Sequence, residues 1–214
     1  MTTLGLIGAG HIGSQLARAA VAHGYDVVVS NSRGPESLTE LILELGDHAT
    51  AGSTADAAAA DLVAVAIPLK DIDSIPADLL AGKIVMDTTN YYPQRDGQVS
   101  ALDAEETTVS ELVQAHFADA KVVKAFNHIY ASAITDDAQS AGTAERRALI
   151  VAGEDAAAKQ TVSEFIDSIG FDVLDIGGLS EGWRIQVGTP AYGPRRDLEE
   201  LEIDVAQAQR PAAH

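Results

Sequence analysis

The sequence contains no cysteine among its 214 residues. This absence excludes a disulfide scaffold, a thiolate nucleophile, zinc held by cysteine and an iron–sulfur cluster. It is also typical of proteins from a reducing compartment, so we expect a cytoplasmic location. The six histidines have no metal-ligand spacing, and no G-x-S-x-G motif marks a nucleophile. We therefore predict neither a metal site nor covalent catalysis.

Basic side chains are also scarce, with 14 Lys and Arg against 32 Asp and Glu and a formal net charge of −18. Phosphate backbones and anionic lipid headgroups repel a chain this acidic, so we expect no nucleic-acid or membrane partner. No apolar run approaches the roughly 18 residues that span a bilayer. The N-terminus lacks the basic segment and apolar stretch of a signal peptide. The apolar fraction of 46% is nevertheless large enough for a sizeable buried core.

Short apolar segments alternate with segments of helical periodicity along the chain, which is the order expected of parallel βαβ units. The predicted strands cover residues 4–7, 25–30, 49–51, 62–67, 83–87, 121–126, 147–152 and 171–176. The predicted helices cover residues 12–23, 35–45, 54–60, 108–117, 155–169 and 197–209, with a broken helical connection over 71–80. This order predicts an α/β fold in which a doubly wound, mainly parallel sheet of the Rossmann type carries a small C-terminal α/β extension.

A glycine-rich turn joins the first predicted strand to the first predicted helix, where residues 8–13 are GAGHIG and match G-x-G-x-x-G. Gly8 permits a tight turn, Gly10 lets backbone amides approach a pyrophosphate, and Gly13 lets the helix pack closely on the strand. A strand-to-helix turn without a ligand is the alternative. The strands on both sides of the turn and the helix that it opens favour a dinucleotide site.

The end of the second predicted strand carries polar residues in place of the carboxylate that binds the ribose hydroxyl in NAD sites. The hydroxyl of Ser30 or Ser32, the amide of Asn31 and the guanidinium of Arg33 are donors suited to a 2′-phosphate. The alternative is a polar turn with a solvated arginine, because Asn and Ser are common in turns. We predict that the site binds NADP(H).

Side chains at the carboxyl ends of the later strands are expected to face the same crevice. Ile67 and Pro68 would supply an apolar wall for the adenosine ribose or the nicotinamide. Asn90 and Asn127 could hold the ribose or the carboxamide. These four residues extend the predicted cofactor site beyond the glycine turn.

Three further side chains at these strand ends each have a functional and a structural interpretation. Tyr91 and Tyr92 could stack on a second ring system, or they pack only against the turn that follows. His128 could donate or accept a proton, but a single histidine at a strand end is more often a hydrogen-bonded structural residue. His128 is therefore the one catalytic candidate.

On these residues, the chain resembles the NADPH-dependent reductases of the deazaflavin coenzyme F420, also called F420:NADP oxidoreductases, and related bacterial dinucleotide-binding proteins. The resemblance is carried by residues 8–13, the turn 31–33, the strand end 67–68, the segment KVVKAFN at 121–127 and the segment GGLS at 177–180. It implies an NADP(H)-binding Rossmann domain over residues 1–152 and a small C-terminal part over residues 153–214 that covers the substrate site.

The resemblance also implies direct hydride transfer between the nicotinamide and a deazaflavin ring, for which no acid or base is obligatory. The residues implied to bind the cofactor are Ala9, Gly10, His11 and Ile12 at the pyrophosphate, Ser32 and Arg33 at the 2′-phosphate, and Ile67, Asn90 and Asn127 at the ribose and nicotinamide. We expect an NADP-dependent oxidoreductase whose partner is a small redox molecule. A homo-oligomer, in its simplest form a dimer, is the expected assembly.

Other functions stay open because residues 90–97 and 128–130 differ from the archaeal reductases where the second ring should lie. A flavin (FMN or FAD) reductase or a ferric reductase is one alternative. Imine, pyrroline-5-carboxylate and β-hydroxyacid reductases share the glycine turn, but they need a further helical domain of about 100 residues. A non-enzymatic NADP(H)-sensing module is a third hypothesis, and the role of the acidic C-terminal helix is open.

Overall fold

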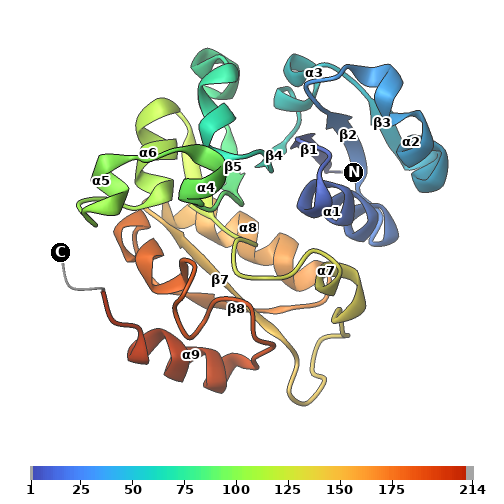
Figure 1. Cartoon of the computed structure of the whole chain (residues 1–214). Helices are drawn as coiled ribbons and strands as arrows, with labels where there is room; N and C mark the ends of the chain where they lie inside the picture. The colour runs from blue at the N-terminus through green and yellow to red at the C-terminus, as the bar shows by residue number, and fades with distance from the viewer. Residues whose placement is uncertain (1, 211–214) are drawn as a thin grey trace.

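An eight-stranded sheet forms the centre of the protein, in the order β3-β2-β1-β4-β5-β6-β7-β8 (Figure 1). The structure is a computed structural model and describes residues 2–210. The strands are β1 (Thr3–Ile7), β2 (Asp26–Ser30), β3 (Ala49–Ala51), β4 (Leu62–Val65), β5 (Ile84–Asp87), β6 (Lys121–Lys124), β7 (Ala148–Gly153) and β8 (Asp172–Asp175). Neighbouring strands are parallel except β6 and β7, which are antiparallel. The predicted α/β fold with a mainly parallel sheet is confirmed.

Helices connect the strands, and side-chain caps set where several of them begin. Ser53 and Asp56 form a capping box at the start of α3, and Thr108 and Glu111 form another at the start of α6. The α-helices are α1 (His11–Ala22), α2 (Thr39–Leu45), α3 (Thr54–Ala58), α4 (Pro93–Asp96), α5 (Ser100–Asp103), α6 (Val109–His116), α7 (Ala133–Asp136), α8 (Ala156–Ser168) and α9 (Leu198–Gln207). The 3-10 helices are η1 (Pro35–Leu38), η2 (Gly46–His48), η3 (Leu69–Ser74), η4 (Ala77–Leu80) and η5 (Leu179–Ile185).

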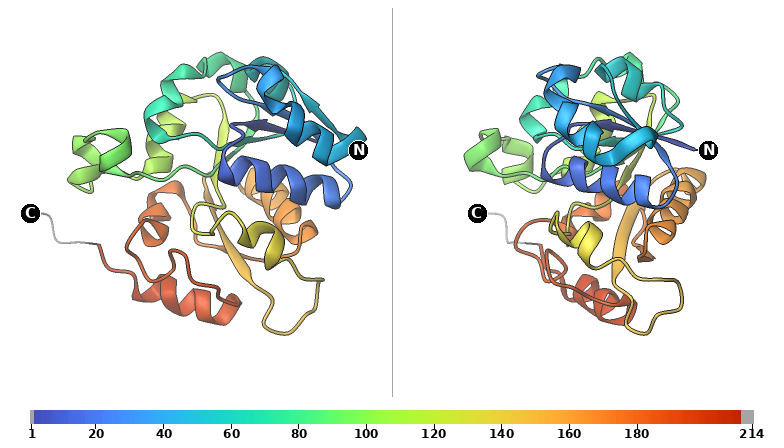
Figure 2. Two further views of the ribbon diagram at one scale, coloured as in Figure 1. Left: turned by 45° about the vertical axis from the view of Figure 1, so that its right-hand side comes forward. Right: turned by 90° about the vertical axis from the view of Figure 1, so that its right-hand side faces the viewer.

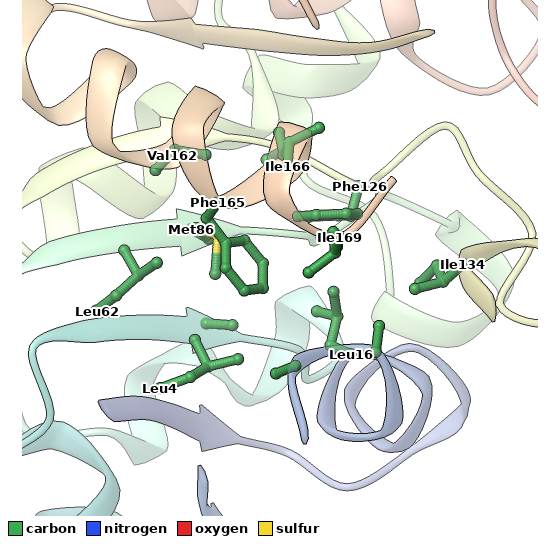
Figure 3. Packing of buried hydrophobic residues seen from close by; sticks show 14 of the residues in the cluster. Leu4, Leu16, Leu62, Met86, Phe126, Ile134, Val162, Phe165, Ile166 and Ile169 are labelled. Atoms are coloured by element: carbon green, nitrogen blue, oxygen red, sulfur yellow. The ribbon is translucent and has the colours of Figure 1, made fainter. Parts of the chain in front are cut away.

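Two layers of helices cover the sheet and bury its apolar residues. On one face, Leu4 of β1 and Leu16 of α1 lie in one cluster with Phe165 and Ile166 of α8 (Figure 3). On the other face, α3, η3, η4 and α6 pack against β1, β4, β5 and β6. Because both faces of the central strands are buried, these strands are apolar throughout rather than alternating.

Beyond β6, the C-terminal region of the chain adds β7 and β8 to the sheet and covers them with its own helices. A third apolar cluster joins Ala148 and Ile150 of β7 to Ile185 of η5 and Leu201 of α9. Figure 2 shows α9, in red, on the far side of this region from the blue N-terminal strands. The sheet is thus continuous across the predicted boundary at residue 152, and the division into two domains stays a prediction.

The structure departs from the predicted elements at several ends. The helix predicted over 35–45 is a 3-10 turn followed by α2, and the connection over 71–80 is divided into η3 and η4 on either side of Pro76, whose nitrogen has no hydrogen to donate. The strands predicted over 62–67 and 121–126 end earlier, at Val65 and Lys124. The residues beyond these ends leave the sheet and enter the loops that line the cavities described next.

No helix among residues 2–210 combines the length and the apolar character needed to cross a bilayer.

Candidate functional site

A cavity of about 560 Å³ lies at the carboxyl ends of β1, β2 and β4. We call it the glycine-loop cavity. Its lining includes eight of the predicted cofactor residues, namely Gly8, Ala9, Gly10, Asn31, Ser32, Arg33, Ile67 and Pro68. The fold therefore brings three separate sequence segments together at the edge of the sheet where ligands of doubly wound proteins bind.

The three glycines of the turn have different structural roles. Gly8 has φ +112°, and a Cβ there would lie 2.4 Å from the carbonyl oxygen of Ala66, so the tight turn against the end of β4 requires glycine. A Cβ on Gly13 would lie 1.9 Å from the carbonyl oxygen of Gly8, so the close approach of α1 requires glycine as well. A Cβ on Gly10 would meet nothing within 4 Å. The space beside Gly10 is open to a ligand.

The N-terminus of α1 is suited to bind an anion. Gly10 is the N-cap residue and provides no side-chain hydrogen bond to the first-turn amides. The 12-residue helix therefore presents free N–H groups and the positive end of its dipole beside Ala9 and Gly10, which line the cavity. The predicted residues His11, Ile12 and Gly13 belong to α1 itself, where His11 is exposed and Ile12 packs against the core.

The turn after β2 is held by its own side chains and leaves one cation exposed. The Asn31 Oδ1 accepts a hydrogen bond from the backbone nitrogen of Arg33 at 2.9 Å, and its Nδ2 donates to the Ser37 hydroxyl at 2.8 Å. Ser32 and Arg33 are exposed, and within residues 2–210 the Arg33 guanidinium has no hydrogen-bond or ion-pair partner. The guanidinium is thus available to a phosphate, whereas the Asn31 side chain stabilises the turn through its hydrogen bonds.

Ser30 does not take part in this surface. Its side chain is buried, and its hydroxyl donates to the carbonyl oxygen of Leu6 at 3.1 Å. The expectation that Ser30 could donate to a 2′-phosphate is therefore wrong, because this hydroxyl ties β2 to β1. Ser32 and Arg33 keep that role as a prediction.

A second cavity, of about 310 Å³, lies at the carboxyl ends of β5 and β6. We call it the β5–β6 cavity. It is lined by residues 90–94, by Leu102, Thr108, Val109 and Ser110, by Lys124 and Asn127, and by Gly182, Gln186 and Val187. Because β4 and β5 are parallel neighbours, with Val65 beside Asp87, the two cavities lie along the same edge of the sheet.

The predicted residues Asn90 and Asn127 line the β5–β6 cavity rather than the glycine-loop cavity. Asn90 Nδ2 donates to the Asn127 carbonyl oxygen at 2.7 Å, and Asn127 Nδ2 donates to the Ile185 carbonyl oxygen at 2.7 Å. Asn127 Nδ2 also lies 3.2 Å from Asn90 Oδ1. These amides join the ends of β5 and β6 to η5, and their contact with a nicotinamide or ribose stays a prediction.

Tyr91 and Tyr92 also line the β5–β6 cavity, and their hydroxyl groups are fixed by protein partners. The Tyr91 hydroxyl donates to Asp103 Oδ1 at 2.7 Å. The Tyr92 hydroxyl lies 2.5 Å from that of Tyr192, and burial raises the pKa of Tyr192. The Arg95 guanidinium lies 4.8 Å from the centre of the Tyr92 ring. The rings are therefore held in place where they border the cavity.

A buried ion pair at the β5–β6 cavity was not predicted from the sequence. Lys124 and Asp87 face each other across β6 and β5, and their side chains are 4% and 0% exposed. Lys124 Nζ lies 3.2 Å from Asp87 Oδ2 and also donates to the Thr89 carbonyl oxygen, while the Ser110 hydroxyl donates to the same Oδ2. Burial lowers the pKa of Lys124, and the negative charge of Asp87 opposes that shift. The available signal was a charged residue in each of two apolar segments, Asp87 at the end of the strand predicted over 83–87 and Lys124 inside the strand predicted over 121–126.

His128 lies in the protein interior rather than in either cavity lining. Its side chain is buried, and neither ring nitrogen has a hydrogen-bond partner within residues 2–210. Burial, followed by the charges of Arg147 and Lys124, lowers the pKa of His128 to about 3. The ring is therefore neutral at neutral pH, and we propose no proton-transfer role for it.

The sequence and the structure were compared with those of known proteins. Residues 3–91 match the family model described as NADP oxidoreductase, coenzyme F420-dependent. The metalloreductase STEAP3 of Rattus norvegicus is 31% identical over 185 residues, which are 86% of this chain and 35% of the rat protein. This chain therefore spans about a third of the length of that relative.

Two solved structures share both the fold and recognisable sequence. A hypothetical protein from Sinorhizobium meliloti is 34% identical, with a TM-score of 0.79, over 92% of this chain and 96% of that chain. A protein of Arthrobacter sp. FB24, provisionally described as an F420-dependent NADP reductase, is 29% identical, with a TM-score of 0.71, over 85% of this chain and 87% of that chain. Residues 3–91 therefore match the family of coenzyme F420-dependent NADP oxidoreductases, and the chain as a whole shares its fold and part of its sequence with these two proteins.

Proposed function

We propose that this protein transfers a hydride between NADPH in the glycine-loop cavity and the deazaflavin ring of coenzyme F420 in the β5–β6 cavity. The observation that carries the proposal is the pair of neighbouring cavities along one edge of the sheet. One contains a phosphate-binding turn and a free guanidinium, and the other is bordered by two fixed tyrosine rings. The resemblance of the chain to F420-dependent reductases supports the choice of acceptor.

Each part of NADPH can be assigned to the residues that would bind it. The free amides at the start of α1 would hold the pyrophosphate, and Ser32 with Arg33 would bind the 2′-phosphate. NADPH supplies the hydride, and the protein supplies distance and orientation. We propose that Ile67 and Pro68 direct the nicotinamide from the end of β4 towards the end of β5.

A flavin or a ferric chelate is the second candidate acceptor. The 31% identity to a metalloreductase over 86% of this chain supports it. The β5–β6 cavity, of about 310 Å³, is at the lower end of the range for small-molecule sites. This volume suits one ring system, whether a flavin or a deazaflavin. The expected homodimer, and the expected lack of nucleic-acid and membrane partners, stay predictions.

The acceptor is identified by mixing the protein with NADPH and following absorbance at 340 nm with F420, FMN, FAD or a ferric chelate in turn. We expect the highest kcat/KM with F420. A higher value with a flavin or a ferric chelate would replace F420 by that acceptor. NADPH binding without turnover of any acceptor would contradict the reductase and favour the NADP(H)-sensing module.

The location of the acceptor is tested by filling the β5–β6 cavity from its border. Val187 lines this cavity and is 45% exposed, so Val187→Trp adds a large ring without burying a new group in the core. We expect a fall in kcat/KM for the acceptor of at least ~10-fold, equivalent to about 1.4 kcal/mol, and an unchanged Kd for NADPH. Leu43→Trp, at a position that is 77% exposed and lines neither cavity, is the matched control. Equal effects of the two substitutions would show that the acceptor binds elsewhere.

A further inference from the structure

The Lys124–Asp87 ion pair is an unusual feature for the end of two buried strands. Two charges removed from water gain little stability over apolar side chains of similar size, because desolvation offsets their attraction. Both neighbouring strands are otherwise apolar at their buried positions, with Val85 and Met86 before Asp87, and Val123 before Lys124. Folding alone gives no reason for an ammonium group at this position.

The hydrogen bonds around the pair are distributed unevenly. Asp87 accepts four of them, from Lys124, from the Ser110 hydroxyl, and from the Thr89 backbone nitrogen and hydroxyl at 2.9 and 2.6 Å. An ammonium group has three N–H donors, and within residues 2–210 Lys124 has two partners, Asp87 and the Thr89 carbonyl. Lys124 lines the β5–β6 cavity, so its remaining donor is available to a molecule bound there.

We propose that Lys124 donates a hydrogen bond to the electron-accepting edge of the acceptor ring and stabilises the charge that arrives with the hydride. This inference rests on the proposed function. In the transfer, the C4–H bond of the nicotinamide breaks, its electron pair forms a new C–H bond on the acceptor ring, and the nicotinamide becomes a cation. The acceptor ring gains one negative charge on its conjugated nitrogen–carbonyl edge, and solvent later supplies a proton. A fixed positive charge beside that edge favours the reduced ring.

The neighbours of Lys124 would keep it charged and in place. Asp87 opposes the effect of burial on the Lys124 pKa, and Ser110 and Thr89 hold the carboxylate in one orientation. A purely structural pair would only join β5 to β6 and would not distinguish the oxidised from the reduced ligand.

The test is a double variant, Lys124→Met with Asp87→Asn, which removes both charges and leaves no unpaired buried ion. Oxidised and chemically reduced F420 are titrated anaerobically, and the Kd of each form is measured by fluorescence. We expect the Kd of reduced F420 to rise at least ~10-fold, since charge-assisted hydrogen bonds contribute about 1.5–3 kcal/mol. We expect the Kd of oxidised F420 to change by less than about 3-fold and the Kd of NADPH to be unchanged.

The matched control uses the same two substitutions on an exposed ion pair at the start of β6. Lys121 Nζ lies 3.0 Å from Asp155 Oδ2, and neither residue lines the β5–β6 cavity. Lys121→Met with Asp155→Asn should leave both Kd values for F420 unchanged. Equal changes of the two Kd values in the Lys124 double variant, or no change in either, would overturn the inference.

The wild-type protein provides a measurement that does not depend on the folding of a variant. If Lys124 donates to the electron-accepting edge, we expect reduced F420 to bind at least ~3-fold more tightly than oxidised F420, which is the ratio of the two changes expected above. Equal affinities would overturn the role of Lys124 while leaving the reductase intact. A wild-type protein that neither binds nor turns over F420 would instead contradict the proposed function, so the two failures are distinguishable.

Discussion

The two cavities of this protein are built in different ways, although they lie along the same edge of one sheet. Most of the residues that line the glycine-loop cavity lie in three short segments of the sequence, 7–10, 31–33 and 66–68. The β5–β6 cavity is assembled from side chains of residues as distant as Asn90 and Val187. A site that depends on backbone geometry leaves a motif in the sequence, whereas a site that depends on tertiary contacts does not.

The largest expected effect comes from adding a methyl group to the glycine turn, at Gly13 in one variant and at Gly10 in another. Gly13→Ala places a Cβ 1.9 Å from a backbone oxygen of Gly8, so we expect a loss of about 3 kcal/mol in the free energy of unfolding. The expected loss is large because neither backbone segment can move without displacing α1 from the sheet. Urea denaturation of both proteins measures it.

Gly10→Ala is the matched control for that substitution. The new methyl group meets no protein atom within 4 Å, so stability should change by less than about 1 kcal/mol. The methyl group would occupy the space of the pyrophosphate, and we expect the Kd for NADPH to rise at least ~10-fold. Tight NADPH binding by a folded Gly10→Ala protein would show that the pyrophosphate does not approach this turn.

A second prediction concerns His128, which lies near the β5–β6 cavity but outside it. Its pKa is lowered from 6.5 to about 3, so below pH 6.5 the unfolded chain binds a proton that the folded chain does not. Stability is therefore lost as the pH falls from 6.5 towards 3. Between pH 7 and about pH 4.5 this group alone should remove about 2–3 kcal/mol.

His128→Phe should abolish that part of the acid sensitivity and leave hydride transfer unchanged. Urea denaturation of the wild type and of the variant at both pH values isolates the contribution of His128. His48→Gln, at an exposed position, is the control and should retain the wild-type acid sensitivity. The same loss of stability on acidification in the wild type and in His128→Phe would show that the ring is not buried in its neutral form.

The smallest expected effect tests the cofactor preference of the glycine-loop cavity. Arg33→Ala should raise the Kd for NADPH at least ~10-fold, or about 1.4 kcal/mol, and leave the Kd for NADH nearly unchanged. Arg18→Ala is the control, because Arg18 of α1 pairs with Glu44 of α2, does not line the cavity, and changes the net charge equally when it is removed. Equal losses for NADPH and NADH would show that Arg33 does not bind the 2′-phosphate.

The sequence alone predicts most of the fold because the elements are strongly patterned. All eight strands were predicted, and β1, α1 and the glycine turn between them lie within about two residues of the predicted positions. The reversal of β7 was not predicted, because an apolar run has the same appearance in either direction. The prediction for Ser30 was wrong, because its hydroxyl at the end of β2 donates to the neighbouring strand β1 and not to a ligand.

The candidate site was predictable to the extent that it is local. The cofactor residues in the turns at 8–13 and 31–33 could be predicted from their position, because each turn directly follows a predicted strand. The Lys124–Asp87 pair required the register of β5 against β6, which only the folded sheet supplies. Asn90 and Asn127 were correctly chosen as strand-end amides, but their pairing with each other and with Ile185 depends on η5, more than 50 residues away.

The reversal of β7 has a mechanical consequence for the molecule. Two residue pairs join β6 to β7, Val123 with Gly153 and Lys124 with Ala152. The ladder between β6 and β7 is therefore short, and the residues after 147 are held to the other strands both by this joint and by the packing of α8 against β1 and α1. Lys124, which borders the β5–β6 cavity, is itself part of this joint.

Two hydrogen bonds brace the joint from the side of η5. The Thr108 hydroxyl donates to the carbonyl oxygen of Leu179 at 2.9 Å, and Asn127 donates to that of Ile185 at 2.7 Å. Gly182, Gln186 and Val187 thus line the cavity from beyond the joint, and its other lining residues come from before β7. The shape of the β5–β6 cavity therefore depends on how these two parts of the sheet are joined and not on one loop alone.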